Sequence, residues 1–201
     1  LKLEQANAAD LHEYAALGVA FALVFDRPFP PYWPHRQVPQ SAVPIGDVDV
    51  VQRFNFYVQS NRDHKLEQEP SQLTFEKLKF LVDSEVVLSA LEYAQHNRIS
   101  ASHFEDAFFS IKYDEGRVGS GNMDFVWGLP TYKLKDIEKN GGICVDQAYY
   151  ATILGKGRGI PTIYFNGQVT DGGQSLVGYL TNSGKWELEC GRYESQNFPK
   201  G

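Results

Sequence analysis

The sequence predicts an α+β protein, with a helical N-terminal region packed on a smaller core of one helix and antiparallel strands. Up to about residue 130, apolar residues recur at the three- and four-residue spacing of amphipathic helices. From about residue 131 to 201, glycine-punctuated segments rich in β-branched and aromatic residues are typical of strands. The chain has 201 residues, 42% of them hydrophobic, which is enough for one good core or two small ones. These regions form either one compact unit or a fragment of a larger protein.

Candidate N-caps predict where the helices of the first region begin. Short polar residues cap helices because their side chains accept hydrogen bonds from backbone N–H groups of the first turn. Five such residues precede amphipathic runs: Asp10, Asp49, Thr74, Ser84 and Ser102. Two of them are followed three residues later by a glutamate, Glu13 and Glu105, which is the capping-box spacing.

A proline-rich segment interrupts this helical region. Six of the ten prolines fall between Arg27 and Pro44, and proline is incompatible with a regular helix interior. Phe29, Tyr32 and Trp33 give the segment apolar surface to bury. We therefore expect an ordered loop with extended and turn geometry.

The second region predicts two helices followed by three strands. A short helix carrying Leu134 and Ile137 should end at residues 140–142, and another should run from Cys144 to about Gly155. Glycine is unfavourable in a helix by about 1 kcal/mol relative to alanine, so Gly155, Gly157 and Gly159 predict a loose end. The expected strands are 162–169, 175–181 and 185–190, with the turn at 182–184 joining the last two as a hairpin.

Cys144 is the candidate nucleophile of this region. A thiol at a helix N-terminus lies among unpaired N–H groups at the positive end of the helix dipole, and both favour the thiolate. Gly141 and Gly142 leave room beside it for a substrate carbonyl. The alternative is a small buried hydrophobe, because free cysteine is among the most buried residue types. Asp146, in the first turn, is expected to complement the helix dipole without a catalytic role.

The segment 131–193 resembles the transglutaminase-like branch of the papain-like cysteine superfamily. The similarity lies in GGICVDQA, a helix, GIP, a strand, GGQSLVGYL and KWELECGRY, in that order. It implies a papain-like core in which Cys144 is the nucleophile and attacks an amide to form an acyl-enzyme. The catalytic histidine of that family falls on Gln174 here, and its orienting aspartate falls on Glu189.

The replacement of histidine by Gln174 predicts a catalytically degenerate member, a pseudoenzyme. A glutamine amide can hydrogen-bond but cannot hold a thiolate as an ion pair or protonate a leaving group. No histidine follows Cys144; the five histidines are His12, His35, His64, His96 and His103. Two alternatives remain: an active cysteine hydrolase or acyltransferase whose base is His35 or His103 folded over the cleft, and a structural or assembly module of a larger protein. Cys190, one residue after Glu189 on a strand, is expected in the core.

The same observations limit the partners and cofactors. A net charge of -6 and no Lys/Arg cluster argue against nucleic acid, whose phosphates require a basic surface. No apolar run approaches the roughly 18 residues that a membrane span needs. The acidic residues of the second half lack calcium-loop spacing, and the glycines at 155–159 end a helix rather than begin one, so we expect no metal and no cofactor. The expected partner is a polypeptide or another amide-bearing ligand.

Overall fold

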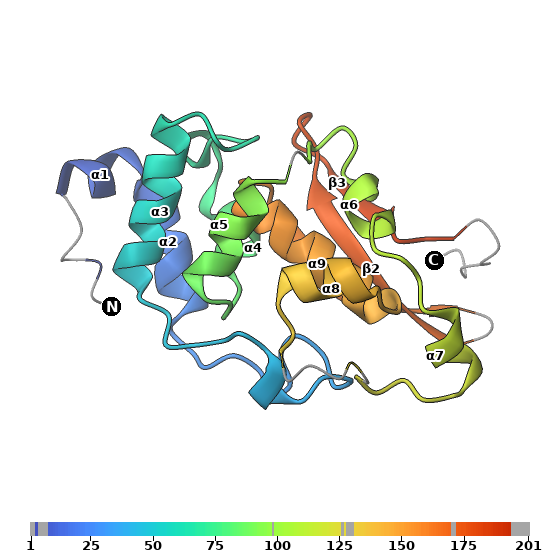
Figure 1. Cartoon of the computed structure of the whole chain (residues 1–201). Coiled ribbons are helices and arrows are strands. Elements are labelled where there is room, and N and C mark those ends of the chain that lie inside the picture. The colour runs from blue at the N-terminus through green and yellow to red at the C-terminus, as the bar shows by residue number, and fades with distance from the viewer. Residues whose placement is uncertain are drawn as a thin grey trace.

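The computed structural model describes Leu3 and residues 8–97, 99–125, 127, 131–169 and 172–193. The described residues form an α+β protein, as the sequence predicts, with helices grouped around one central helix and a small antiparallel sheet on one side (Figure 1). In chain order the helical elements are α1 (Ala8–Glu13), α2 (Ala15–Val24), η2 (Gln40–Ala42), α3 (Val50–Arg62), η3 (Pro70–Gln72), α4 (Phe75–Val82), α5 (Leu88–Gln95), α6 (Glu105–Phe109), α7 (Glu115–Gly119), α8 (Leu134–Asn140) and α9 (Cys144–Gly157).

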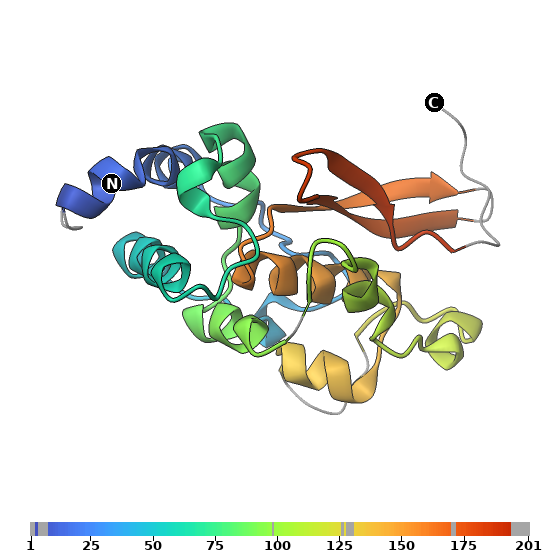
Figure 2. The ribbon, with the colours of Figure 1, turned by 90° about the horizontal axis from the view of Figure 1, so that it is seen from above.

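The sheet has the order β1-β2-β3 and is antiparallel throughout. Its strands are β1 (Thr162–Val169), β2 (Gly172–Leu180) and β3 (Trp186–Cys190), close to the predicted ranges. β1 and β2 pair in continuous register from Thr162 opposite Tyr179 onward, and a bulge interrupts the pairing of β2 with β3. Seen from above in Figure 2, the sheet lies over α9 as a separate layer.

Helix α9 is the centre of the molecule. Every residue from Val145 to Gly157 is buried, because α4, α5, α6 and α8 and the strands β1 and β2 all contact this helix. Its charged residues are therefore paired. Lys156 donates to the carbonyl oxygens of Phe80 and Thr162 and to the carboxylate of Asp83, which connects the end of α9 to α4 and β1.

The glycines near the end of α9 allow close packing and do not loosen the helix. The helix continues to Gly157, two residues beyond the predicted end. A Cβ at Gly157 would overlap the Ala94 side chain and lie 2.6 Å from the Leu91 carbonyl oxygen of α5. A Cβ at Gly155 would lie 2.9 Å from the Phe104 ring. The prediction of a loose end is therefore wrong, because close helix approach outweighs the low helix propensity of glycine.

The helix starts confirm two of the predicted N-cap positions. Asp49 caps α3 by accepting a 3.0 Å hydrogen bond from the Gln52 N–H, and Thr74 directly precedes α4. The other three predicted caps are wrong by two or three residues, since α1 begins at Ala8, α5 at Leu88 and α6 at Glu105. Ser84 is instead buried and accepts hydrogen bonds from the buried guanidinium of Arg53.

One hydrophobic core contains residues from both sides of residue 130, so the helical region and the sheet region share their packing. The proline-rich segment is ordered against it, as expected. Its rings form a chain of contacts from Phe29 to Trp33 and from Trp33 to Tyr149 of α9, with ring centroids 6.5 and 5.8 Å apart. Within the described part of the chain, no helix is both long enough and apolar enough to cross a membrane.

Candidate functional site

Cys144 is the first residue of α9 and lies on the wall of a cleft of about 790 Å³. Its side chain is partly exposed, so the alternative of a sealed core thiol does not hold for this cysteine. Four parts of the chain line the cleft: the proline-rich segment from Pro30 to Gln37, Met123 after α7, the start of α9, and the facing residues of β1 and β2.

Close backbone packing fixes the start of α9. Gly142 pairs with the segment before α7, because its N–H donates to the Lys112 carbonyl and its own carbonyl accepts from the Asp114 N–H at 2.9 Å. Gly141 has φ of +77°, and a Cβ there would overlap the Lys112 carbonyl oxygen. A Cβ at Gly142 would meet the Asp146 carboxylate. Both glycines are therefore required by the approach of these segments.

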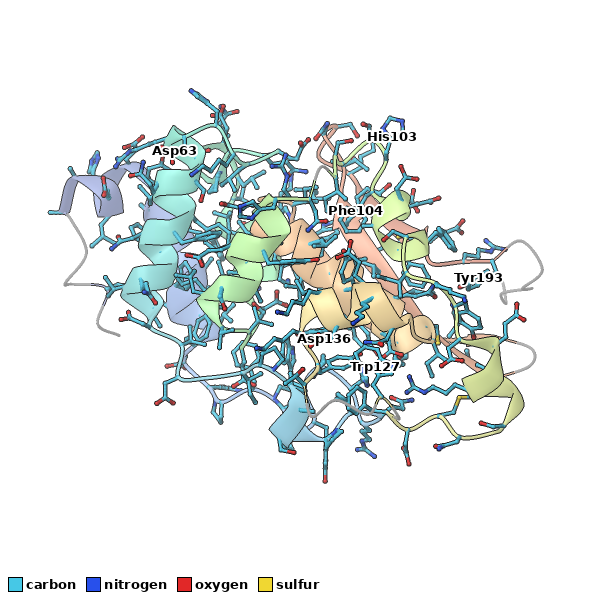
Figure 3. The ribbon with its side chains drawn as sticks, in the orientation of Figure 1. Asp63, His103, Phe104, Trp127, Asp136 and Tyr193 are labelled. Carbon is cyan, nitrogen blue, oxygen red and sulfur yellow. The ribbon has the colours of Figure 1, made fainter. Side chains whose placement is uncertain are left out.

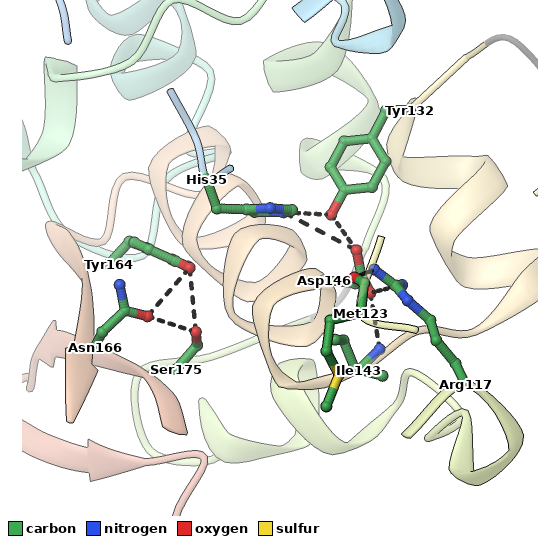
Figure 4. A network of polar contacts seen from close by, with 9 residues as sticks. All are labelled: His35, Arg117, Met123, Tyr132, Ile143, Asp146, Tyr164, Asn166 and Ser175. Carbon is green, nitrogen blue, oxygen red and sulfur yellow. Dashed lines mark hydrogen bonds and ion pairs between the residues drawn. The ribbon is translucent and has the colours of Figure 1, made fainter. Parts of the chain in front are cut away.

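Asp146, two residues after Cys144 in the first turn of α9, is the hub of a buried polar network (Figure 4). One carboxylate oxygen accepts hydrogen bonds from Arg117 Nη1 and from the Ile143 N–H, both at 2.8 Å. The other accepts from the Tyr132 hydroxyl. Burial raises the pKa of Asp146, and Arg117 opposes that shift. Asp146 was expected only to complement the helix dipole; its bonds with the Ile143 N–H, Arg117 and Tyr132 add to that position in the first turn.

His35 lies in the same cleft as Cys144 and extends this network. Its Nε2 is 2.8 Å from the Tyr132 hydroxyl and 4.0 Å from Asp146 Oδ1, and its ring stacks on Tyr164. Its Nδ1 is buried and has no hydrogen-bond partner among the described residues. Burial, with a smaller contribution from the positive charge of Arg117, lowers the pKa of His35 to about 3, while Gln37 opposes this in part. The ring is therefore neutral at pH 7.

A second polar group faces His35 from the sheet. In Figure 4 the side chains of Tyr164 and Asn166 from β1 and of Ser175 from β2 point toward one another. Ser175 Oγ donates to Asn166 Oδ1 at 2.7 Å and lies 3.1 Å from the Tyr164 hydroxyl. These three side chains supply the sheet wall of the cleft.

Neither Gln174 nor Glu189 lines the cleft that contains Cys144. Neighbouring strand residues point to opposite faces, so with Ser175 toward the cleft, Gln174 points away from it. Its amide is buried and donates to the Gly191 carbonyl oxygen at 3.0 Å. Glu189 is exposed and forms an ion pair with Arg192 at 3.0 Å. The structure therefore does not bring Cys144, Gln174 and Glu189 together.

The other predicted residues are also placed. Cys190 is fully buried, as expected, and both cysteines are free. His103 lies at the surface on the loop before α6, well apart from Trp127 in Figure 3, and its Nδ1 is 3.1 Å from the hydroxyl of Ser102. Of the two histidines that the sequence offered as bases, only His35 borders Cys144 in the cleft.

The arrangement limits the chemistry available to the thiol. His35 uses Nε2 for Tyr132 and has no partner on Nδ1, so among the described residues no hydrogen bond joins it to the Cys144 sulfur. Among the described residues, the N–H groups of Asp146 and Gln147 donate to the Ile143 carbonyl oxygen, which leaves those of Cys144 and Val145 for an acyl oxygen or a ligand carbonyl. No group of three or more His, Cys, Asp or Glu side chains in the described residues is gathered in a way that could hold a metal ion.

Sequence reasoning assigned no specific role in the site to Arg117, Tyr132, Asn166 or Ser175. The first two come from segments far from Cys144 in the chain, and no spacing rule connects them to it. Ser175 could have been found from strand alternation, had the cleft-facing position been known. Comparisons with protein-family models, curated proteins and solved structures gave no match for this chain.

Proposed function

We propose that the protein is a transglutaminase-like domain that has lost catalysis and retains the Cys144 cleft for a polypeptide or another amide-bearing ligand. The observation that carries this is the isolation of the thiol: Cys144 heads α9 in an open cleft, and among the described residues the only imidazole lining that cleft, His35, makes no hydrogen bond to it. The resemblance of residues 131–193 to the transglutaminase-like branch supports descent from an active enzyme of that kind.

A thiol needs a partner that takes its proton and later returns one to the leaving amine. A neutral imidazole whose pKa is about 3 does both poorly at pH 7. Gln174 is committed to Gly191, and its amide could not act as a base. Ligand binding needs neither function, and the cleft still offers backbone N–H groups, the Asn166 amide and the Ser175 hydroxyl as hydrogen-bonding groups.

Turnover is tested with two substrates, a glutamine-containing peptide followed by ammonia release and a peptide p-nitroanilide followed by absorbance. Cys144→Ala provides the blank at each pH from 6 to 9. Wild-type protein should be no faster than Cys144→Ala. A rate that saturates with substrate and disappears in Cys144→Ala would overturn the proposal.

Binding is tested separately, by fluorescence polarisation of labelled extended peptides. Ser175→Trp fills the cleft wall, and Ser183→Trp on the exposed β2–β3 turn is its matched control. We expect Ser175→Trp to abolish peptide binding and Ser183→Trp to leave it unchanged. Equal binding to both variants would contradict a cleft ligand.

Two histidine variants test how catalysis was lost. Ser175→His directs an imidazole to the cleft face of β2, whereas Gln174→His directs it to the opposite face. Thiol-dependent hydrolysis should therefore gain more from Ser175→His. Greater gain from Gln174→His would mean that the strand turns its other face to Cys144 in the active arrangement.

A second candidate function is an active cysteine hydrolase with His35 as base, favoured by the presence of His35 in the Cys144 cleft, where its Nδ1 has no hydrogen-bond partner among the residues that the structure describes. It predicts thiol-dependent turnover that is lost in both Cys144→Ala and His35→Asn. Its rate would show no acid limb near the ordinary pKa of histidine between pH 7 and 5, because the pKa of His35 is about 3.

A further inference from the structure

A second cavity, of about 300 Å³, lies farther along α9 from the Cys144 cleft. Tyr149, Thr152 and Lys156 form its α9 side, and Thr162 and Tyr164 of β1 form another. Thr152 is eight residues after Cys144, which corresponds to about 12 Å along the helix axis. Pro30, Pro34 and Tyr164 border both spaces, so the two cavities share one wall.

Two residues that line this cavity have buried hydroxyl groups without a hydrogen-bond partner in the described part of the chain. Tyr149 OH and Thr152 Oγ1 make no hydrogen bond to any described residue, although Tyr149 is 1% exposed and Thr152 5% exposed. Buried hydroxyl groups are nearly always paired, because an unpaired one loses its hydrogen bonds to water without compensation. With two residues of this kind lining one cavity, the missing hydrogen-bonding partner comes from outside the chain, as a water molecule or a ligand.

The walls of the cavity define the shape of that partner. Phe29, Trp33 and Tyr164 present aromatic rings, and Pro30 and Pro34 add flat apolar surface. Trp33 meets the Tyr149 ring edge-on, with centroids 5.8 Å apart, which fixes both rings. Such walls favour a planar apolar group, since aromatic side chains pair face to edge or in offset stacks.

The charge of the cavity excludes a charged ligand. Its ionised groups, Lys156 and Asp83, form an ion pair with each other, and Lys156 also donates to two carbonyl oxygens. A charged ligand would therefore lose its hydration without meeting an opposite charge that is free to compensate.

We propose that this cavity is a binding site for a neutral aromatic ring that carries a hydroxyl group, a phenol such as the side chain of tyrosine. The ring lies among Phe29, Trp33 and Tyr164, and its hydroxyl group exchanges hydrogen bonds with Tyr149 OH and Thr152 Oγ1. The phenol is either a free small molecule or a side chain of a polypeptide in the adjoining cleft. The site itself does not depend on the function proposed for Cys144.

The first test is the binding of p-cresol, followed by calorimetry and ligand-observed NMR, with toluene as the probe that lacks the hydroxyl group. We expect saturable p-cresol binding with a Kd of about 1 mM or tighter, the range that so few atoms can reach. Toluene should bind at least fivefold more weakly. Absence of saturable p-cresol binding, which is the outcome for a cavity that holds only water, would overturn the site, as would equal binding of the two probes.

The second test removes the hydroxyl groups one at a time. Tyr149→Phe and Thr152→Val keep the shape of the cavity, and each should weaken p-cresol binding about fivefold, the fold-change expected for one neutral hydrogen bond. Tyr150→Phe is the matched control, because Tyr150 is a buried tyrosine on the same helix that does not line the cavity. Unchanged binding in both Tyr149→Phe and Thr152→Val would refute the proposed contacts, and circular dichroism verifies folding of each variant.

The source of the phenol is distinguished by blocking Cys144 with N-ethylmaleimide. If a tyrosine-containing tripeptide binds more weakly after blocking while p-cresol does not, the ring belongs to a polypeptide in the cleft. If neither changes, the ligand is a free phenol. Peptide binding at Ser175 can fail while p-cresol still binds, so this site and the proposed function are tested separately.

Discussion

Arg117 Nη1 donates a 2.8 Å hydrogen bond to Asp146 Oδ2 at a point where the two side chains are only 1% and 0% exposed. Arg117 belongs to α7 and Asp146 to the first turn of α9, so this bond connects the chain before the core helix to the helix itself. The guanidinium also donates to the Met123 carbonyl, and the carboxylate accepts from Tyr132 and Ile143. Each charge therefore depends on the other for compensation.

Breaking this pair should destabilise the protein strongly. Arg117→Met leaves the Asp146 carboxylate buried without its cation, which typically reduces the free energy of unfolding by about 3–5 kcal/mol. Asp146→Asn should reduce the free energy of unfolding by a similar amount, because it leaves the buried Arg117 guanidinium without its anion. Urea denaturation measures both. Arg62→Ala, which breaks an exposed pair with Asp10 and Glu13, is the control and should hardly move the midpoint. A midpoint for Arg117→Met close to wild type would contradict the network.

The buried His35 should make stability depend on pH below neutrality. Its pKa is about 3 in the folded protein and about 6.5 when unfolded. Between these values the unfolded chain binds a proton that the native protein does not, so stability is complete above about pH 6.5 and falls as the pH decreases toward 3. The loss should reach about 3 kcal/mol by pH 4.

Urea denaturation at pH 7, 6, 5 and 4 measures this loss in wild type and His35→Gln. The difference in unfolding free energy between the two should shrink as the pH falls, since only wild type carries the titrating ring. His103→Gln removes an exposed ring and controls for the loss of any histidine. Parallel pH profiles for wild type and His35→Gln would mean that the ring is not held neutral.

The sequence predicted the α+β class and the elements with strong periodic patterns, including the three strands and the start of α9 at Cys144. It failed where tertiary contacts decided the outcome. Ser84 resembles an N-cap in sequence but is held by Arg53, which comes from α3. Gly157 suggests a frayed helix end but lies against α5. Such contacts are long-range, and local propensity does not encode them.

The candidate site was predictable only in part, because long-range contacts also bring some of its residues together. Cys144 and the loop that carries His35 stand out in the sequence by helix position and by proline content. The β2 residue that lines the cleft was not predictable. Neighbouring strand residues point to opposite faces, so a shift of one residue decides whether Gln174 or Ser175 lies toward the cleft. Arg117 and Tyr132 reach Asp146 through the packing of α7 and of the segment before α8, which no motif spacing records.

Gly157→Ala should be destabilising although alanine is the better helix former. The new Cβ would overlap Ala94 and approach the backbone carbonyl of Leu91, so α5 must move away from α9. Such overpacking costs about 1–3 kcal/mol, more than the gain of about 1 kcal/mol in helix propensity. Gly119→Ala in α7 is the control, because a Cβ there has no neighbour within 4 Å. Thermal unfolding should show a lower Tm for Gly157→Ala, and a higher Tm would refute the close approach.

The two cysteines should differ sharply in reactivity. Cys144 is partly exposed on the cleft wall, whereas Cys190 is fully buried and its pKa is raised by burial and by the nearby Glu105 and Glu187. The thiolate is the reactive form, so Cys190 should not react in the native state. Titration with a chromogenic disulfide should count one thiol per native chain and two in 6 M guanidinium. Two thiols in the native state, or one remaining in Cys144→Ala, would contradict the assignment.

Tyr132 and Tyr149 stack with centroids 5.2 Å apart, yet loss of the hydroxyl group should affect stability in opposite directions. Tyr132 OH donates to Asp146 and contacts His35 Nε2, so Tyr132→Phe leaves buried polar atoms unpaired and should cost about 1–3 kcal/mol. Tyr149 OH has no partner among the described residues, so Tyr149→Phe removes an uncompensated buried group and should gain up to about 1 kcal/mol. Urea denaturation of both variants without added ligand measures the contrast. Equal destabilisation by both would show that Tyr149 OH is already satisfied in the free protein, because the two substitutions differ only in what the hydroxyl groups contact.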